Sequence, residues 1–95
     1  MEIKKTGDYA AWEATLRDRR ALLHVQARVR QMSLGNFADA KSVGNGVVET
    51  RIHYGPGYRL YYTRRGEAIV ILLVGGDKST QKKDIERAKQ LAQNV

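Results

Sequence analysis

Two arginines and a histidine near the middle of this 95-residue chain have the spacing of a phosphate site. Arg51 and His53 lie in a segment where polar and apolar residues alternate, and Arg59 follows a Gly-Pro-Gly turn. Alternation is typical of a half-buried strand, and pairing across the turn puts these side chains on one face of a sheet. Lys78 follows the next apolar segment. Because preorganised cations stabilise the charge that develops in phosphoryl transfer, the pattern predicts a cationic phosphate site.

A carboxylate and a phenol share this predicted face. Glu49 precedes Arg51 in the alternation, and Tyr61 follows Arg59. Either Glu49 or His53 can move a proton to or from an attacking hydroxyl, which makes the site a candidate for catalysis. The alternative is an ordinary polar strand face, on which a Glu49–Arg59 pair contributes at most ~1 kcal/mol and His53 is a surface histidine. Spacing alone leaves both interpretations open.

Other site signatures do not match. The segment Gly75–Ser79 is similar to a phosphate-binding loop, but Asp77 stands where a Walker motif has glycine before its Lys-Ser pair. The two glycines of this segment are expected to let the backbone turn and approach a ligand closely. His24 and His53, in a chain without cysteine, disfavour a zinc site, and there is no Gly-x-Ser-x-Gly elbow. We expect no metal and no other cofactor.

Two helices are predicted in the first third of the chain, after a short strand at residues 2–5. Asp8 is predicted as the N-cap of the first helix and Asp18 as that of the second, which ends near Gly35. The two helices are expected to pack as a hairpin. The apolar stripe of the second helix consists of Leu22, Val25, Val29 and Met32. Its opposite face carries Arg17, Arg20, His24, Arg28 and Gln31. Such a basic stripe is either a phosphate-binding surface or a solvated helix face.

The rest of the chain is predicted as a polar loop, three strands and a helix. These elements cover residues 36–46 (loop), 48–53, 58–63 and 68–74 (strands) and 80–94 (helix). The third strand is apolar throughout, which is typical of a central strand covered on both faces. The predicted order is β-α-α-β-β-β-α in one domain, residues 1–95. An antiparallel sheet with an N-terminal helical hairpin and a C-terminal helix is an α+β fold.

Composition narrows the class of protein. Seventeen lysines and arginines oppose ten acidic residues, giving a net charge of +7 and a pI near 10.0. Such a charge attracts nucleic acid or an acidic protein partner. The absence of cysteine suits a reducing compartment. The N-terminus has no signal-peptide core, and the longest apolar run, residues 68–74, is too short to cross a bilayer. We therefore expect a soluble, cytoplasmic protein.

The chain resembles a known toxin family. The resemblance rests on Gly57-Tyr58-Arg59-Leu60-Tyr61-Tyr62, an apolar strand, Gly75-Gly76-Asp77-Lys78-Ser79-Thr80-Gln81, and then Asp84, Ile85 and Ala88. Tyr9 and Trp12 also fit. These features are similar to the RelE/ParE toxin superfamily, especially its HigB-like branch of addiction module killer proteins. The resemblance implies a RelE-like fold and an endoribonuclease that cuts translated messenger RNA on the ribosome, by attack of a 2′-hydroxyl on the adjacent phosphate.

The resemblance also implies roles for single residues. Arg59 matches the arginine of the Gly-Tyr-Arg motif that contacts the scissile phosphate, and Arg51 and His53 lie on the preceding strand of the same site. Lys78 matches a basic residue that assists the leaving group. The RNA-binding set is expected to be Arg51, Arg59, Tyr61, Lys78 and Lys82.

Two positions depart from RelE. Asp84 stands where RelE has a functional tyrosine in the last helix, and Glu49 replaces a basic residue. The general base is therefore open among His53, Glu49 and Asp84. A structural role for Asp84 is also open, because the dipole of a helix stabilises an anion in its first turn.

The resemblance implies partners as well. A RelE-like or HigB-like toxin has a cognate antitoxin, here expected to be a HigA-like helix-turn-helix protein from the same operon, and the complex binds operator DNA. The ribosome and messenger RNA are the expected targets, and no membrane is involved. One alternative is a non-enzymatic, ParE-like inhibitor of DNA gyrase. Another is a degenerate homologue that keeps only antitoxin and operator binding.

Overall fold

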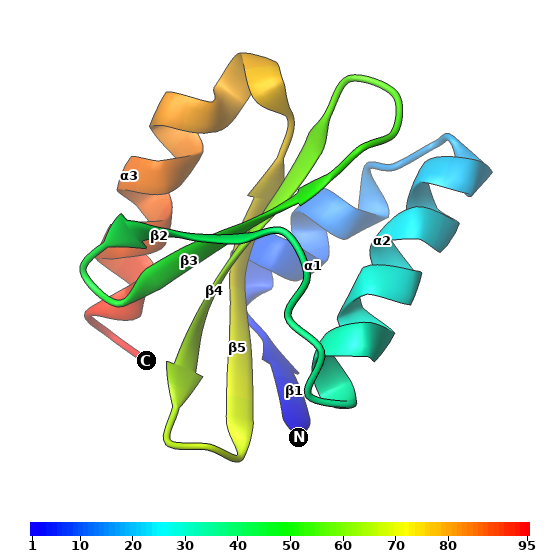
Figure 1. The fold of residues 1–95 in the computed structure, drawn as a ribbon. Helices are drawn as coiled ribbons and strands as arrows, with labels where there is room; N and C mark the ends of the chain where they lie inside the picture. The colour runs from blue at the N-terminus through cyan, green and yellow to red at the C-terminus, as the bar shows by residue number, and fades with distance from the viewer.

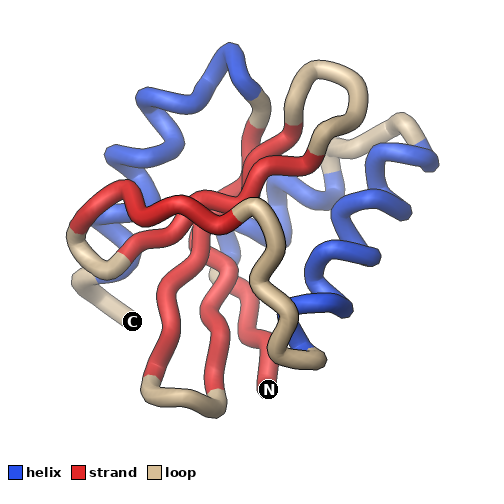
Figure 2. The backbone as a smooth tube through the Cα atoms, viewed as in Figure 1, coloured by secondary structure: helices blue, strands red, loops and turns tan.

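A five-stranded sheet lies between helices on both faces in the computed structural model, which describes residues 1–95 (Figure 1; Figure 2). The elements are β1 (Glu2–Lys5), α1 (Gly7–Ala14), α2 (Arg19–Ser33), β2 (Ala40–Gly44), β3 (Val47–Ile52), β4 (Tyr58–Arg65), β5 (Ile69–Gly76), a 3₁₀ helix (Lys78–Thr80) and α3 (Gln81–Ala92). This architecture confirms the predicted α+β class. No helix combines the length and the apolarity needed to span a membrane.

The strands follow the order β1-β5-β4-β3-β2. Strands β2 to β5 form an antiparallel meander, whereas β1 pairs with β5 in parallel, so the sheet is mixed rather than wholly antiparallel. The prediction of a loop over residues 36–46 was wrong for β2. The side chains of β2 are mostly exposed. An edge strand without a buried face has no apolar alternation that reveals it in a sequence.

Each face of the sheet has its own hydrophobic core. Helices α1 and α2 lie on one face, α1 against β5 and α2 against β1 and β3. Their core, the α1–α2 core, consists of Tyr9, Val25, Met32, Ile52, Leu60, Tyr62, Val70 and Leu72. The core under α3, the α3 core, consists of Val47, Tyr61, Ile71, Leu73, Val74 and Ala88. Strand β5 contributes to both cores, which confirms it as a central strand covered on both faces.

The helix caps agree with the sequence at α2 and differ at α1. The Asp18 carboxylate accepts hydrogen bonds from two backbone N–H groups in the first turn of α2, as predicted. Thr6, not Asp8, caps α1, because Thr6 is extended and its hydroxyl accepts from the Tyr9 N–H at 3.0 Å. Asp8 lies inside the first turn, and its carboxylate accepts from the Arg87 guanidinium of α3 at 2.8 Å.

Strand β5 continues through Gly75 and Gly76 instead of breaking before them. A Cβ at Gly75 would collide with the ring of Trp12, and one at Gly76 with the carboxylate of Asp84. The expectation that these glycines bring the backbone close to a ligand was therefore wrong. They are small because a side chain from α1 and one from α3 pack directly on the strand, on its two opposite faces.

Candidate functional site

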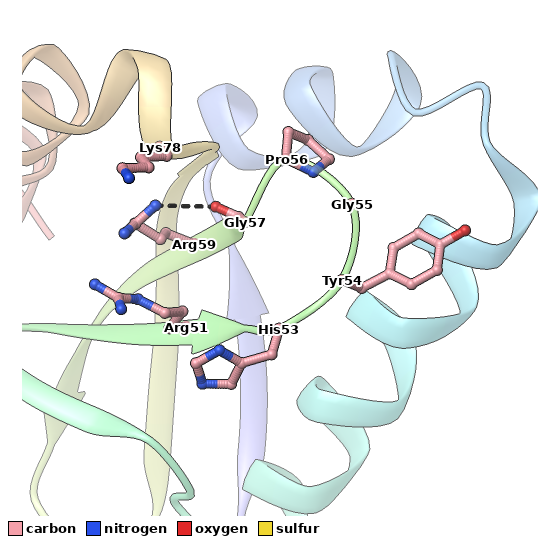
Figure 3. Close-up of a pocket in the computed structure, with 8 residues that line it drawn as sticks. All are labelled: Arg51, His53, Tyr54, Gly55, Pro56, Gly57, Arg59 and Lys78. Atoms are coloured by element: carbon pink, nitrogen blue, oxygen red, sulfur yellow. Dashed lines mark hydrogen bonds between the residues drawn. The ribbon is translucent and has the colours of Figure 1, made fainter.

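A pocket of about 440 Å³ opens where β3 and β4 meet the turn that joins them (Figure 3). Its lining residues are Arg51, His53, Tyr54, Gly55, Pro56, Gly57, Arg59 and Lys78. We call it the cationic pocket, since it contains two arginines, a lysine and a histidine and no acidic side chain. In Figure 3 the charged ends of Arg51, Arg59 and Lys78 lie along one wall, with His53 below them. The four residues that the sequence grouped around a phosphate thus come together.

The register of β3 and β4 explains this grouping. Arg51 lies directly opposite Arg59, and Glu49 directly opposite Tyr61. The predicted sharing of one strand face is therefore confirmed. Like charges directly opposite one another on a sheet destabilise it. The Arg51–Arg59 pair is relieved when an anion lies between the two guanidinium groups, so the pocket favours an anionic ligand.

Arg59 is fixed in place although it reaches the pocket. Its side chain is only 4% exposed, and one terminal nitrogen donates a hydrogen bond to the carbonyl of Gly57 at 3.0 Å. Its Nε lies 3.7 Å from a carboxylate oxygen of Glu49 and makes no hydrogen bond. A buried, held guanidinium loses little conformational freedom on binding an anion, which suits it to a phosphate contact.

Glu49 is buried behind the arginine and is not a solvated strand residue. It is 3% exposed, and besides Arg59 its carboxylate accepts a hydrogen bond from the Gln81 amide at 3.0 Å. The predicted Glu49–Arg59 pair is confirmed, but its burial was not foreseen. Gln81 was also missed as a site residue. Its one sequence signal was its place at the end of the Gly75–Gln81 segment that carries the family resemblance, and it is the first residue of α3.

Tyr61 lies in the α3 core with no exposed surface. The expectation that Tyr61 contacts RNA is therefore contradicted, because α3 covers the ring. Burial and the nearby Glu49 carboxylate raise the pKa of the Tyr61 hydroxyl well above its ordinary value of 10.0. The hydroxyl is thus neutral and makes no hydrogen bond within the protein.

His53 lies at the exposed rim of the pocket. Its Nε2 is 3.8 Å from the carboxylate of Asp39, which also pairs with the Arg28 guanidinium at 3.5 Å. A second hollow, of about 370 Å³, adjoins here and is lined by Asp39, Lys41, Glu49, Arg51 and His53. Asp39 was missed by sequence reasoning, because it lies in the stretch predicted as a loop. Asp39 thus places a carboxylate beside the imidazole and outside the cationic pocket.

The turn between β3 and β4 is anchored to α2. The N–H of Gly57 donates to the carbonyl of Tyr54 at 3.1 Å, so the hydrogen-bonded turn begins one residue earlier than predicted. Gly57 has a φ of +77°, a left-handed backbone conformation that glycine adopts more readily than other residues. The Tyr54 ring stacks on His24 at 4.4 Å, and its hydroxyl donates to Asp18 at 2.9 Å. Tyr54 therefore points away from the pocket and ties its wall to the α2 helix (Figure 3).

Lys78 begins the 3₁₀ helix that links β5 to α3. The Asp77 carboxylate caps this turn, accepting hydrogen bonds from the N–H of Ser79 at 2.8 Å and from its hydroxyl. These bonds lower the pKa of Asp77 below its ordinary value of 3.8. The Lys78 side chain is exposed, and its Cβ lies beside Gly57. The capped turn thus places an ammonium group opposite the end of β4.

Besides Glu49 and Tyr61, two more predicted site residues lie outside the cationic pocket. Asp84 is in the first turn of α3, where its carboxylate contacts Gly76 and accepts a hydrogen bond from the hydroxyl of Thr80. Burial raises its pKa, and it lines a different hollow. Lys82 is exposed further along α3 and does not line the pocket either. No group of three or more His, Asp or Glu side chains anywhere in the protein is arranged to hold a metal ion.

Comparison with known proteins identifies the family. The model of the phage derived protein Gp49-like family (DUF891) matches residues 13–94, a range that includes every residue of the cationic pocket. An uncharacterized protein of Haemophilus influenzae is 46% identical over 95 residues, which cover the whole of this chain and 96% of the relative. This chain therefore belongs to the Gp49-like family of phage-derived proteins.

Proposed function

We propose that this protein is the toxin of a type II toxin–antitoxin pair and that it cuts messenger RNA on the ribosome. The observation that carries the proposal is the cationic pocket, in which three cations and an imidazole converge without an acidic side chain. Membership of the Gp49-like family supports a toxin of this kind. The resemblance to RelE-like and HigB-like toxins supports the more specific nuclease activity.

The pocket residues suit transfer of a phosphoryl group within the RNA chain. The 2′-oxygen forms a new bond to the adjacent phosphorus, and the bond from phosphorus to the 5′-oxygen breaks, giving a 2′,3′-cyclic phosphate and a 5′-hydroxyl. Arg51 and Arg59 bind the non-bridging oxygens, whose charge rises in the transition state. Lys78 donates a proton to the leaving 5′-oxygen.

His53 is the proposed general base. It is the pocket side chain with a ring nitrogen that can accept the proton of the 2′-hydroxyl, and it lies at the exposed rim where the RNA enters. Glu49 is engaged with Arg59 and Gln81, and Asp84 lies outside the pocket. We therefore assign Glu49 to positioning Arg59, and Asp84 to packing on β5.

The partners follow from the same proposal. A net charge of +7 favours association with ribosomal RNA, whose phosphates attract a basic protein at long range. A cognate antitoxin, proposed to be a HigA-like helix-turn-helix protein, restrains the toxin and takes it to operator DNA. Because the proposed target is the translating ribosome, the proposal places the protein in the cytoplasm.

The test is to map the 5′ ends of a messenger RNA incubated with the protein, with and without ribosomes stalled on it. We expect new ends inside the codon in the decoding site, and only with ribosomes. Arg51→Ala and Lys78→Ala are the informative variants, because both side chains are exposed and their loss spares the fold. Each is expected to lower the cleavage rate about 10²- to 10³-fold. Arg65→Ala, at an exposed arginine that ends β4 and does not line the pocket, is the matched control.

Intact message under every condition would contradict the nuclease. A DNA-damage response in cells, with intact message, would favour the gyrase inhibitor instead. Equal losses in all three variants would show that net charge, and not the cationic pocket, governs cleavage.

A further inference from the structure

The outward side of α2 carries the exposed large hydrophobic residues of this protein. Leu23 is 56% exposed and Leu34, at the end of the helix, is 75% exposed. They lie eleven residues apart, which is about three helical turns, so both point to the same side. Ala27 and Arg30 lie between them on that side, and Arg20 lies one turn before Leu23. We call Arg20, Leu23, Ala27, Arg30 and Leu34 the outer stripe.

The outer stripe is not explained by packing within the chain. The core-facing side of α2 is occupied by Ala21, Val25 and Met32, which are buried. A shallow hollow of about 290 Å³ lies on the outward side, lined by Arg20, Leu23, His24 and Ala27. Nothing in the chain covers it. Exposed leucines on one side of a helix, with Ala27 between them, make this side a candidate surface for another molecule.

The positive charge of α2 indicates what kind of molecule covers the outer stripe. Residues 19–33 contain four arginines and no acidic residue. Arg28 is paired with Asp39 and Thr50, but Arg19, Arg20 and Arg30 have neither an ion pair nor a side-chain hydrogen bond within the protein. A second copy of the chain would bring like charges together on this surface. A partner with acidic groups beside apolar ones complements it.

We propose that the outer stripe docks an acidic amphipathic helix of a partner protein, with leucine-sized side chains seated between Leu23 and Leu34. This inference rests on the proposed function, according to which the partner is the antitoxin. RNA is disfavoured as the occupant, since phosphates pair with the arginines but leave both leucines in water. None of the outer-stripe residues lines the cationic pocket, so partner binding and cleavage can be tested separately.

The experiment measures the affinity of the full-length protein for the antitoxin encoded beside it, by calorimetry, and for a single-stranded RNA oligonucleotide. Leu23→Gln/Leu34→Gln removes the apolar contacts, and Arg20→Glu/Arg30→Glu reverses two charges. Lys4→Glu/Arg65→Glu makes the same change of net charge at exposed residues of β1 and β4, outside the outer stripe, and neither residue has an ion pair. Each outer-stripe variant is expected to bind the antitoxin about tenfold more weakly or worse. The control is expected to bind as the unmodified protein does.

Ribosome-dependent cleavage by the same variants separates this inference from the proposed function. Weak antitoxin binding with normal cleavage supports the outer stripe as the docking surface. Normal antitoxin binding by both outer-stripe variants overturns it, while the nuclease proposal stands. Loss of RNA binding in the arginine variant but not in the leucine variant also overturns it and makes RNA the occupant. If the unmodified protein neither cleaves messenger RNA nor binds the antitoxin, the proposed function is contradicted, and this inference, which rests on it, is overturned as well.

Discussion

The two faces of the sheet differ, although the same strands supply both. On the α1–α2 face the side chains of β3 are Val48, Thr50 and Ile52, and the one polar group among them, the buried Thr50 hydroxyl, is hydrogen-bonded to Arg28 and to the carbonyl of Ala38. On the α3 face the side chains of β3 run from the buried Val47, through the buried Glu49, to the exposed Arg51. The β3 side chains of the first face carry no charge, whereas those of the other face change from core to cationic pocket within a single strand.

This difference indicates that the charged half of the α3 face does not serve to raise the free energy of unfolding. The Glu49–Arg59 pair is buried, and the Nε of Arg59 lacks a hydrogen bond. Apolar side chains of similar volume are often as stabilising as a buried ion pair, or more so. A buried ion pair in place of apolar packing is a departure of the kind expected at a functional site. The Glu49–Arg59 pair borders the cationic pocket, and this supports the proposed role of Arg59.

The largest effect on stability is expected from the α1–α2 core. Leu72→Ala removes a fully buried side chain of the α1–α2 core and leaves a cavity, lowering the free energy of unfolding by about 2–5 kcal/mol. Leu23→Ala, the same change at an exposed leucine, is expected to cost less than about 0.5 kcal/mol. Urea unfolding followed by circular dichroism measures both. Equal losses would contradict this placement of the core.

A smaller effect is expected on the charged face. Glu49→Ala leaves the Arg59 guanidinium buried without its anion and is expected to cost about 3 kcal/mol of unfolding free energy. Replacing both residues by methionine is expected to recover most of that loss, because apolar side chains then fill the space, but to abolish cleavage. If the double variant were no more stable than Glu49→Ala, the pair would be structural and the contrast between the two faces would fail.

The smallest effect is expected at the edge of the pocket. Asp77→Ala removes the cap of the 3₁₀ turn and is expected to cost about 1 kcal/mol at neutral pH. The folded-state pKa of Asp77 is lowered below 3.8, so its stabilisation is fully present above that pH. It is lost as the pH falls through the lowered pKa. Thermal melts between neutral pH and pH 2 should therefore converge for the two proteins at the acid end. A constant difference across that range would rule out the carboxylate as the stabilising group.

Most of the fold was predictable because its signals are local. The Asp18 cap, the glycines around Pro56 and the alternation in β3 act over a few residues, and they correctly gave α2 and the β3–β4 pair. Strand β2 was not predictable from pattern, since it lies at an edge with exposed side chains. The parallel pairing of β1 with β5 joins segments far apart in the sequence, which no local signal encodes.

The membership of the pocket was predictable, but the surroundings of its residues were not. Period-two alternation correctly placed Arg51 and Arg59 on one face. It also placed Glu49 and Tyr61 there, but it could not reveal that α3 covers both of them. Asp39, which lies beside the imidazole of the pocket, comes from a segment with no recognisable pattern. Burial depends on which element packs where, and that is a property of the whole fold.

The pairing of β1 with β5 also determines when the protein is completed during its own synthesis. β1 leaves the ribosome before its partner strand, because β5 follows α1, α2 and strands β2 to β4 along the chain. Contacts between segments so far apart wait until both have emerged. Lys78 emerges in the same late stretch, as does Gly76, the partner of Arg59 across β4 and β5. A nascent chain therefore cannot assemble its cationic pocket until β5 and Lys78 have emerged, after every other strand of the sheet has been made.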